Sequence, residues 1–273
     1  MPINRNAVQL LAPIVSNRRL GIYHQIVLEV GDLVRYIKPG NFIAISVGGE
    51  SSRMILRRAF AISRVNDRGT IELIISPMGS GSKWLCSLPE GSQLNVVTPL
   101  GTAFGMPSEP VTALLVGGGY GSAPLFGLAD SLKEHGHRVI MALGASTAAK
   151  IYAPIEGRRS ATLLKIFTED GSAGDLGRVT DNLPELINEH GVMVIYSCGP
   201  MPMLQAVSDI AQKADIAHQC AVEESMACGV GICMTCVIPT KTSNGEVKNL
   251  RSCIDGPVMD GEAVQWHLVG EQL

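Results

Sequence analysis

Aromatic side chains are scarce in this chain of 273 residues, where Phe, Trp and Tyr together make up 4%. So low a content disfavours an aromatic platform on which single-stranded nucleic acid could stack. The net charge of −3 comes from 22 basic and 25 acidic residues, a balance that indicates no basic surface for nucleic acid or anionic lipid. No apolar run reaches the roughly 18 residues that a membrane span requires. We therefore expect neither a nucleic-acid partner nor a membrane.

The beginning of the chain lacks the basic, apolar and small-residue pattern of a secretory signal peptide. Its seven cysteines are odd in number and spread through a chain much larger than a disulfide-stapled domain. Disulfide pairing is thus disfavoured. We expect a cytoplasmic protein whose thiols are free for other chemistry.

Four cysteines have the plant-type spacing C-x4-C-x2-C…C of ligands to a [2Fe-2S] cluster: Cys228, Cys233, Cys236 and Cys253. Three thiolates from one loop need a tightly curled backbone, and Gly229 and Gly231 can supply positive φ there. Residues 241–249, before the fourth cysteine, indicate a hairpin with Asn-Gly at its turn. A zinc site is the alternative, but such sites usually have two C-x2-C pairs or a Cys/His mixture, and one C-x2-C pair is present.

The pattern of apolar and turn residues divides the chain into three segments, 1–108, 109–217 and 218–273. Short β-like runs separated by turns predict a small antiparallel barrel in the first, at residues 7–16, 22–29, 42–47, 59–63, 70–76 and 93–97. Apolar strands alternate with helical segments in the second, which indicates a doubly wound parallel sheet. The third is the small cysteine-bearing module. The predicted fold is therefore a multi-domain β plus α/β protein.

A buried strand in the second segment runs into a glycine turn, residues 117–121, and then into a helix. Gly118 and Gly119 would let the backbone approach a pyrophosphate, and the helix N-terminus would offer N–H donors. Pro124 stands where the third glycine of G-x-G-x-x-G would be, and no acidic residue ends the next strand near Ser146. An ordinary strand-to-helix turn is the alternative.

A second strand of this segment ends in Cys198, Gly199 and Pro200. Ligands of open α/β sheets bind at the carboxyl ends of the strands, so these residues are expected to face the same crevice as Gly118 and Gly119. Cys198 would then lie close to a nicotinamide ring. The alternative is that Cys198 is a small buried hydrophobic residue.

Seven motifs occur in an order that resembles one superfamily: residues 57–63, 79–85, 99–101, 117–121, 168–174, 198–200 and the cysteine loop. The chain resembles the ferredoxin–NADP reductase superfamily of flavoproteins and, within it, the iron–sulfur electron-transfer subunits of NAD-linked dihydroorotate dehydrogenases. The resemblance covers nearly all of the chain. It implies that 1–108 is an FAD-binding β-barrel domain, 109–217 an NAD-binding α/β domain and 218–273 a [2Fe-2S] cluster module.

The resemblance implies two FAD-binding elements, namely Arg57, Arg58, Ala59, Phe60 and Ala61, and then Gly79, Ser80, Gly81 and Ser82. Arg58 would pair with the pyrophosphate, because a planar guanidinium suits phosphate oxygens, and Phe60 would lie along the isoalloxazine edge. Ala61 replaces a serine of the family pattern, so a hydrogen bond to the flavin ring would come from the backbone or from Ser63. The second element would offer N–H donors at a helix start, although an ordinary Gly/Ser turn is the alternative.

These cofactors imply an oxidoreductase in which FAD exchanges hydride with NAD and single electrons with the cluster. By the same resemblance, the partner is an FMN-containing catalytic subunit that oxidises dihydroorotate to orotate in pyrimidine biosynthesis, in an assembly of two copies of each subunit. The flavin and iron–sulfur subunits of ferredoxin reductases or hydrogenases are the first alternative. A non-enzymatic iron–sulfur sensor or scaffold is the second.

Two points stay open from the residues alone. Lys150, Arg158 or Arg159 could bind the 2′-phosphate of NADP, and the missing acidic strand end favours NADP, whereas the resemblance favours NAD. Apolar residues also flank the cysteines, at Met226, Val230, Ile232 and Met234. They would either dock a redox partner or exclude water from the cluster.

Overall fold

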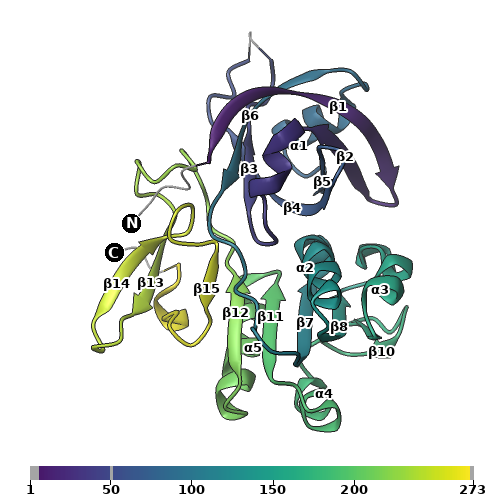
Figure 1. Ribbon diagram of the computed structural model, residues 1–273, viewed down its shortest axis with the longest axis vertical. Coiled ribbons are helices and arrows are strands. Elements are labelled where there is room, and N and C mark those ends of the chain that lie inside the picture. The colour runs from purple at the N-terminus through teal and green to yellow at the C-terminus, as the bar shows by residue number, and fades with distance from the viewer. Residues whose placement is uncertain (1–5, 50–51, 271–273) are drawn as a thin grey trace.

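Six antiparallel strands close into a barrel in the N-terminal part of the chain (Figure 1). The computed structural model describes residues 6–49 and 52–270, so residues 1–5 of the predicted first segment and 271–273 of the third lie outside it. The barrel strands are β1 (Val8–Leu20), β2 (Tyr23–Glu29), β3 (Phe42–Ile45), β4 (Arg58–Asn66), β5 (Thr70–Ile75) and β6 (Gln93–Leu100). Their order around the barrel is β1-β2-β5-β4-β3-β6. Buried Ile, Leu and Val side chains from these strands fill the interior, which confirms the predicted barrel.

Two short helices belong to the barrel. The 3₁₀ helix η1 (Gly31–Tyr36) connects β2 to β3, and α1 (Ser80–Ser87) lies between β5 and β6. Leu85 of α1 is fully buried among the barrel side chains. The packing of Leu85 therefore fixes the N-terminus of α1 beside Arg58 at the start of β4.

A seven-stranded sheet follows, in the order β10-β9-β8-β7-β11-β12-β15. Six strands are parallel: β7 (Thr112–Gly118), β8 (Arg138–Ala145), β9 (Leu163–Thr168), β10 (Asp175–Leu176), β11 (Val194–Cys198) and β12 (Ala217–Ala221). The chain moves outward from β7 to β8 and β9 and then returns to place β11 on the other side of β7. This reversal of strand order creates a crevice at the carboxyl ends of β7 and β11.

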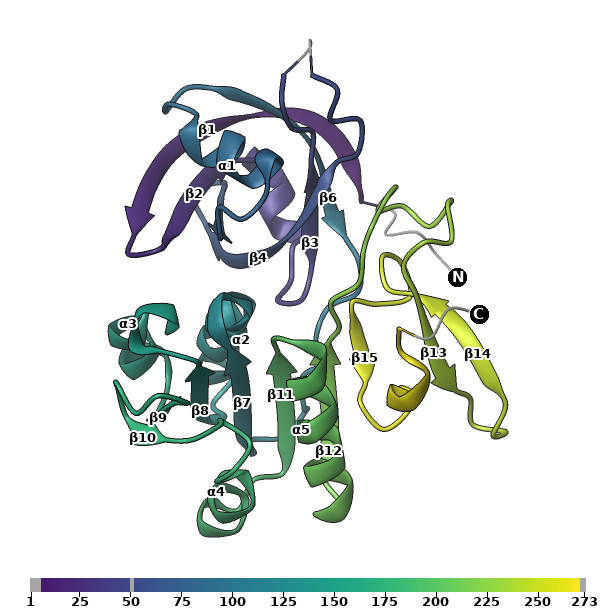
Figure 2. The ribbon, with the colours of Figure 1, turned by 180° about the vertical axis from the view of Figure 1, so that it is seen from behind.

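Helices cover both faces of the sheet (Figure 2). Between the strands lie η2 (Gly119–Ser122), α2 (Ala123–Glu134), η3 (Ala148–Lys150), α3 (Pro154–Ser160), α4 (Leu183–His190) and α5 (Met201–Lys213). Apolar side chains of α2 pack on one face with Leu115 and Met141, and those of α4 and α5 pack on the other with Leu114 and Ile140. Consecutive strand residues are thus buried on opposite faces of the sheet, and this explains why the strands are continuous apolar runs in the sequence. The arrangement confirms the predicted doubly wound fold.

The C-terminal part contains a hairpin of β13 (Val237–Lys241) and β14 (Val247–Arg251), then β15 (Val258–Asp260) and η4 (Trp266–Leu268). The turn of the hairpin includes the predicted Asn-Gly pair at 244–245. β15 pairs antiparallel with β12 and so extends the parallel sheet. β12 itself crosses the predicted boundary at 217/218, and the boundaries stay a prediction. No helix in the described part of the chain is long and apolar enough to span a membrane.

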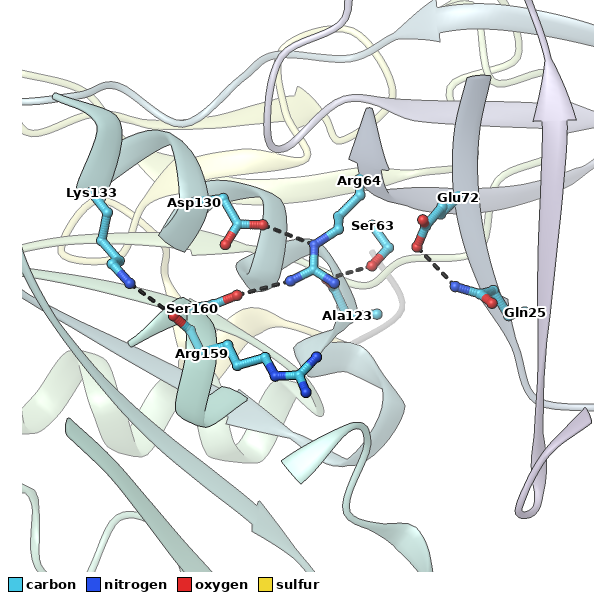
Figure 3. Close-up of polar contacts among 9 residues, drawn as sticks. All are labelled: Gln25, Ser63, Arg64, Glu72, Ala123, Asp130, Lys133, Arg159 and Ser160. Atoms are coloured by element: carbon cyan, nitrogen blue, oxygen red, sulfur yellow. Dashed lines mark hydrogen bonds and ion pairs between the residues drawn. The ribbon is translucent and has the colours of Figure 1, made fainter. Parts of the chain in front are cut away.

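Helix α2 lies between the sheet and the barrel, and polar contacts fasten it and the end of α3 to β4 (Figure 3). The Arg64 guanidinium donates through Nε to Asp130 Oδ2 at 2.8 Å and through Nη2 to Ser160 Oγ at 2.8 Å. The Ser63 hydroxyl donates to the carbonyl oxygen of Ala123 at 2.9 Å. These contacts hold the crevice at the start of α2 in a fixed position beneath the barrel.

Candidate functional site

A cavity of about 300 Å³ lies where the barrel meets the crevice of the sheet. Predicted site residues from both sides line it: Ala59, Phe60 and Ala61 of β4, with Gly118, Cys198, Gly199 and Pro200 of the strand ends. The sheet pairing explains this convergence, because Cys198 is in register with Gly117 on the adjacent strand β7. The structure therefore brings the expected flavin strand and the expected nicotinamide residues to one space.

Glu223 and Tyr120 also line this cavity, and reasoning from the sequence had not singled them out. Burial, and next the charge of Glu223, raise the pKa of the Cys198 thiol to about 12, so this thiol stays protonated at neutral pH. Burial is likewise the first cause that raises the pKa of Tyr120, followed by Glu223 and Cys198. The charge of Glu223 therefore acts on both Cys198 and Tyr120. Two consecutive acidic residues directly before the cysteine loop were the signal that could have found Glu223.

The second predicted flavin element lies at the N-terminus of α1. A Cβ on Gly81 would lie 3.2 Å from Arg58 Nε and 3.2 Å from Val47 Cγ2, so a glycine leaves the room that this arginine occupies. Ser82 Oγ exchanges hydrogen bonds of 3.1 Å with the backbone of Gly79. A guanidinium beside the first N–H groups of a helix is an arrangement that suits a pyrophosphate.

Two other predicted flavin contacts have different partners here. Arg57 is directed to β6, where its guanidinium donates to the carbonyl oxygen of Asn95 at 2.9 Å and to Asn95 Oδ1 at 2.8 Å. Ser63 is buried, with its hydroxyl donating to Ala123, so it fastens α2 instead of pointing at the cavity. The hydroxyl of Ser80 lies 3.5 Å from Met54 Sδ beside the same helix end.

A second cavity, of about 660 Å³, follows the carboxyl ends of β7, β8 and β9 and is lined by both Gly118 and Gly119. Of the three candidate cations for a 2′-phosphate, Lys150 lines this cavity, while Arg158 and Arg159 of α3 are not among its lining residues. Arg178, which sequence reasoning missed, lines it as well. The cavity has room and positive charge for a dinucleotide.

The carboxylate that seemed absent from this cavity is one strand further along. Glu169 follows β9 and lines the cavity, and its N–H donates to the Ala145 carbonyl at the end of β8 at 3.1 Å. The Ser172 hydroxyl accepts a hydrogen bond of 2.7 Å from the N–H of Ala148, which ties the β9 loop to the β8 loop. The end of β8 has no acidic residue, as the sequence indicates, but Glu169 after β9 brings a carboxylate to the same cavity.

The four predicted cluster ligands lie close enough to influence one another's protonation. Hydrogen bonds, first from Thr235 and then from Cys228, lower the pKa of the Cys233 thiol to about 6. Burial raises the pKa of Cys253 to about 12, with a hydrogen bond to Cys236 as the next cause and the charge of Cys228 contributing. Cys228 thus interacts with Cys233, and Cys253 interacts with both Cys236 and Cys228.

The loop around these sulfurs fits a two-iron cluster. Gly229 and Gly231 have φ of 70° and 81°, as the curled loop required. Two backbone N–H groups donate to Cys228 Sγ, from Val230 at 3.5 Å and from Ile232 at 3.3 Å. Within residues 6–49 and 52–270, no group of three or more Cys, His, Asp or Glu is arranged to hold a metal ion.

The cysteine loop packs directly on the wall of the first cavity. Cys236 and Cys253 are buried in an apolar cluster with Phe42, and Met226 packs against the same cluster. Phe42 and Met226 also line the cavity between barrel and sheet. The thiolates and the cavity are therefore separated by a thin apolar wall.

The apolar residues that flank the cysteines divide into two groups. Met226 and Val230 pack inward against the buried cluster. Ile232 is 80% exposed and Met234 52% exposed, beside the exposed Cys233. Ile232 and Met234 therefore leave an apolar surface uncovered on the outer side of the cysteine loop.

Comparison with known proteins places these features in one family. Residues 223–265 match the family described as the iron–sulfur cluster binding domain of dihydroorotate dehydrogenase B. A protein of Caldanaerobacter subterraneus subsp. tengcongensis is 33% identical over 94% of this chain and 98% of its own. One of Bacillus velezensis is 36% identical over 86% of this chain and 90% of its own. Both are named dihydroorotate dehydrogenase B (NAD(+)), electron transfer subunit.

Solved structures with the same fold include an NADH-dependent reduced ferredoxin–NADP oxidoreductase, with a TM-score of 0.83 and 26% identity over 94% of this chain and 91% of that one. A cytochrome P450 reductase of Amycolatopsis has a TM-score of 0.62 and 21% identity over 76% of this chain and 66% of that one, and it shows the fold alone. The resemblance noted from the motifs is confirmed. This chain is an oxidoreductase subunit that belongs to the family of dihydroorotate dehydrogenase B electron transfer subunits.

Proposed function

We propose that this chain receives electrons from an FMN-containing subunit that oxidises dihydroorotate to orotate and passes them through a [2Fe-2S] cluster and FAD to NAD⁺. The route would serve pyrimidine biosynthesis in the cytoplasm. The observation that carries the proposal is the wall that Phe42 and Met226 form between the barrel–sheet cavity and the buried Cys236 and Cys253. FAD, when bound, supplies the conversion between a hydride and single electrons.

In this proposal the three predicted segments have separate tasks. Residues 1–108 would hold FAD, 109–217 NAD and 218–273 the cluster through Cys228, Cys233, Cys236 and Cys253. Arg58 and the N–H groups at Gly79–Ser82 would bind the FAD pyrophosphate, since a cation and a helix N-terminus both favour negative charge. Ala59 and Ala61 are small enough to let a flat ring lie along β4.

The sheet residues of the cavity would orient the nicotinamide. Gly118 and Gly199 present backbone without side chains, and the neutral thiol of Cys198 adds no charge beside the ring. Pro200 begins the turn into α5 at the same edge. These residues together would exclude water from the face on which hydride transfer takes place.

NAD, not NADP, is the proposed nicotinamide. Glu169 lines the dinucleotide cavity, where a carboxylate can accept a hydrogen bond from a ribose 2′-hydroxyl and would repel a 2′-phosphate. Lys150 and Arg178 line the same cavity and would supply the positive charge that a pyrophosphate needs.

The exposed apolar residues Ile232 and Met234 support a docking site for the catalytic subunit at the outer side of the cysteine loop. An electron that reaches the cluster from outside would enter there, close to the exposed Cys233. The proposed assembly contains two copies of each subunit.

Co-purification tests the proposal. We expect natively expressed protein to bring with it an FMN-bearing chain, and the complex to reduce NAD⁺ when dihydroorotate is added. The matched control is the Cys233→Ala variant, which should retain FAD and lose dihydroorotate-dependent NAD⁺ reduction. A chain that binds no flavin under any reconstitution would overturn the proposal.

A second candidate follows from the structural neighbour with a TM-score of 0.83, an NADH-dependent reduced ferredoxin–NADP oxidoreductase. In that case the same cofactors would serve ferredoxin-linked electron transfer. A flavin and [2Fe-2S] spectrum with ferredoxin-dependent activity, and without dihydroorotate activity, would favour this candidate.

A further inference from the structure

Arg251 joins the two segments that carry the cysteines. It stands at the end of β14, two residues before Cys253, and its Nη1 donates to the carbonyl oxygen of Gly231 at 3.0 Å. Gly231 belongs to the loop between Cys228 and Cys233. A single guanidinium therefore connects the loop of three thiolates to the turn that supplies the fourth.

Asp255 holds this guanidinium in place. Its Oδ2 accepts from Arg251 Nε at 3.3 Å and from the Arg251 backbone N–H at 2.9 Å. The side chain of Asp255 is 8% exposed and that of Arg251 30% exposed. Because the pair is largely removed from water, its geometry is better defined than that of a surface ion pair.

The peptide group that Arg251 contacts also contacts a thiolate. The carbonyl of Gly231 and the N–H of Ile232 belong to the same peptide, and that N–H donates to Cys228 Sγ at 3.3 Å. A cation on a peptide carbonyl polarises the peptide and strengthens the hydrogen bond that its N–H donates.

We propose that Arg251 is a positioning residue of the cluster, which raises the reduction potential by polarising the Gly231–Ile232 peptide toward Cys228. The inference rests on the proposed [2Fe-2S] cluster. Reduction adds negative charge to the cluster, and hydrogen bonds to its sulfurs stabilise that charge. Loss of the guanidinium therefore lowers the potential, whereas loss of the Asp255 charge raises it, because the cation is then uncompensated.

The test compares Arg251→Met with Asp255→Asn by anaerobic redox titration of the visible and electron paramagnetic resonance signals of the cluster. We expect opposite shifts, each about tenfold in the equilibrium constant for one-electron reduction, or about 59 mV. Arg19→Met is the matched control, since Arg19 Nε donates to the Gly21 carbonyl at 2.9 Å in the β1–β2 turn and the same cation is lost there. Its cluster potential should equal that of the wild type.

Unchanged potentials in both variants, or shifts of the same sign, overturn the proposal. If Arg251→Met retains FAD but holds no iron, the positioning role is supported. Asp255→Asn alone then tests whether the charge of Arg251 raises the reduction potential: a raised potential in this variant supports that effect, and an unchanged or lowered potential overturns it. Wild-type protein that binds no iron and sulfide on reconstitution would instead overturn the proposed cluster itself.

Discussion

Gly127 of α2 sets the distance between the barrel and the parallel sheet. A Cβ at this position would lie 2.6 Å from the carbonyl oxygen of Ser63, which is closer than real Cβ atoms come to any oxygen. That oxygen belongs to the backbone of β4, so no side-chain rotation can relieve the contact. We expect Gly127→Ala to push α2 away from β4 and to strain the Ser63 and Arg64 contacts beside it.

Two opposing effects decide the magnitude. Alanine is favoured over glycine in a helix interior by about 1 kcal/mol, and overpacking costs about 1–3 kcal/mol. Gly157 of α3 offers the matched control, because its Cβ would lie 3.2 Å from Leu164 Cδ2, a side-chain atom that can move. Gly157→Ala should be neutral or stabilising. Since the helix propensity cancels between the variants, Gly127→Ala should be less stable than Gly157→Ala by about 1–3 kcal/mol.

Urea unfolding of the FAD-loaded protein, followed by circular dichroism and by flavin release, measures this difference. The start of α2 is also part of the crevice, so we expect slower reduction of the flavin by NADH in Gly127→Ala. If Gly127→Ala is as stable as Gly157→Ala or more stable, the reasoning about the spacing of barrel and sheet is refuted.

Three further results are expected. Burial lowers the pKa of His218 to about 4, below the ordinary value of about 6.5. Between these two pH values the unfolded state binds more protons than the folded state, so the folded state loses stability as the pH falls. The free energy of unfolding should drop by about 2 kcal/mol from pH 7 to pH 5. His218→Gln should remove this part of the slope in urea unfolding, and parallel curves for wild type and variant would contradict it. Glu169→Gln should tighten NADPH binding relative to NADH binding about tenfold, or about 1.4 kcal/mol, when both Kd values are measured by calorimetric titration. Glu185→Gln of α4 is the control and should leave the ratio of the two Kd values unchanged. An unchanged ratio in Glu169→Gln would place the ribose elsewhere. Ile232→Glu should weaken the complex with the catalytic subunit at least about tenfold and leave the cluster absorbance intact. The control, Val247→Glu on β14, should leave both the complex and the absorbance unchanged. Loss of the absorbance in Ile232→Glu would instead assign Ile232 to shielding the cluster.

The features that could be predicted from the sequence are those with local causes. The cysteine spacing, the positive φ of Gly229 and Gly231 and the alternation of the barrel strands all depend on neighbouring residues. The approach of Gly118 to Cys198 could also be predicted, because parallel strands place their carboxyl ends at one edge. These features were sufficient for the fold and for the shared cavity.

The features that escaped prediction depend on contacts between distant residues. Ser63 was one of two expected sources of a hydrogen bond to the flavin ring, beside the backbone, but the passage of α2 beneath β4 brings the carbonyl of Ala123 to its hydroxyl. Glu169 was overlooked because the acidic residue was sought at the end of β8, and the loop after β9 turns back over the same cavity. Arg251 stands 20 residues from Gly231, and nothing in the local pattern indicates their contact.

The return of the chain to the nucleotide sheet has a consequence for how the three parts can move. β15 follows the cysteine turn and pairs with β12, so the cluster segment is anchored on both sides of the cysteines. Without β15, the edge of β12 that faces away from β11 would present a row of unpaired N–H and C=O groups. The cysteine segment is therefore not an exchangeable cassette or a carrier on a tether. In the proposed electron route, folding alone would fix the position of the cysteines relative to the barrel–sheet cavity, and turnover would be controlled by the molecules that enter the two cavities and by the partner proposed to dock on the cysteine loop.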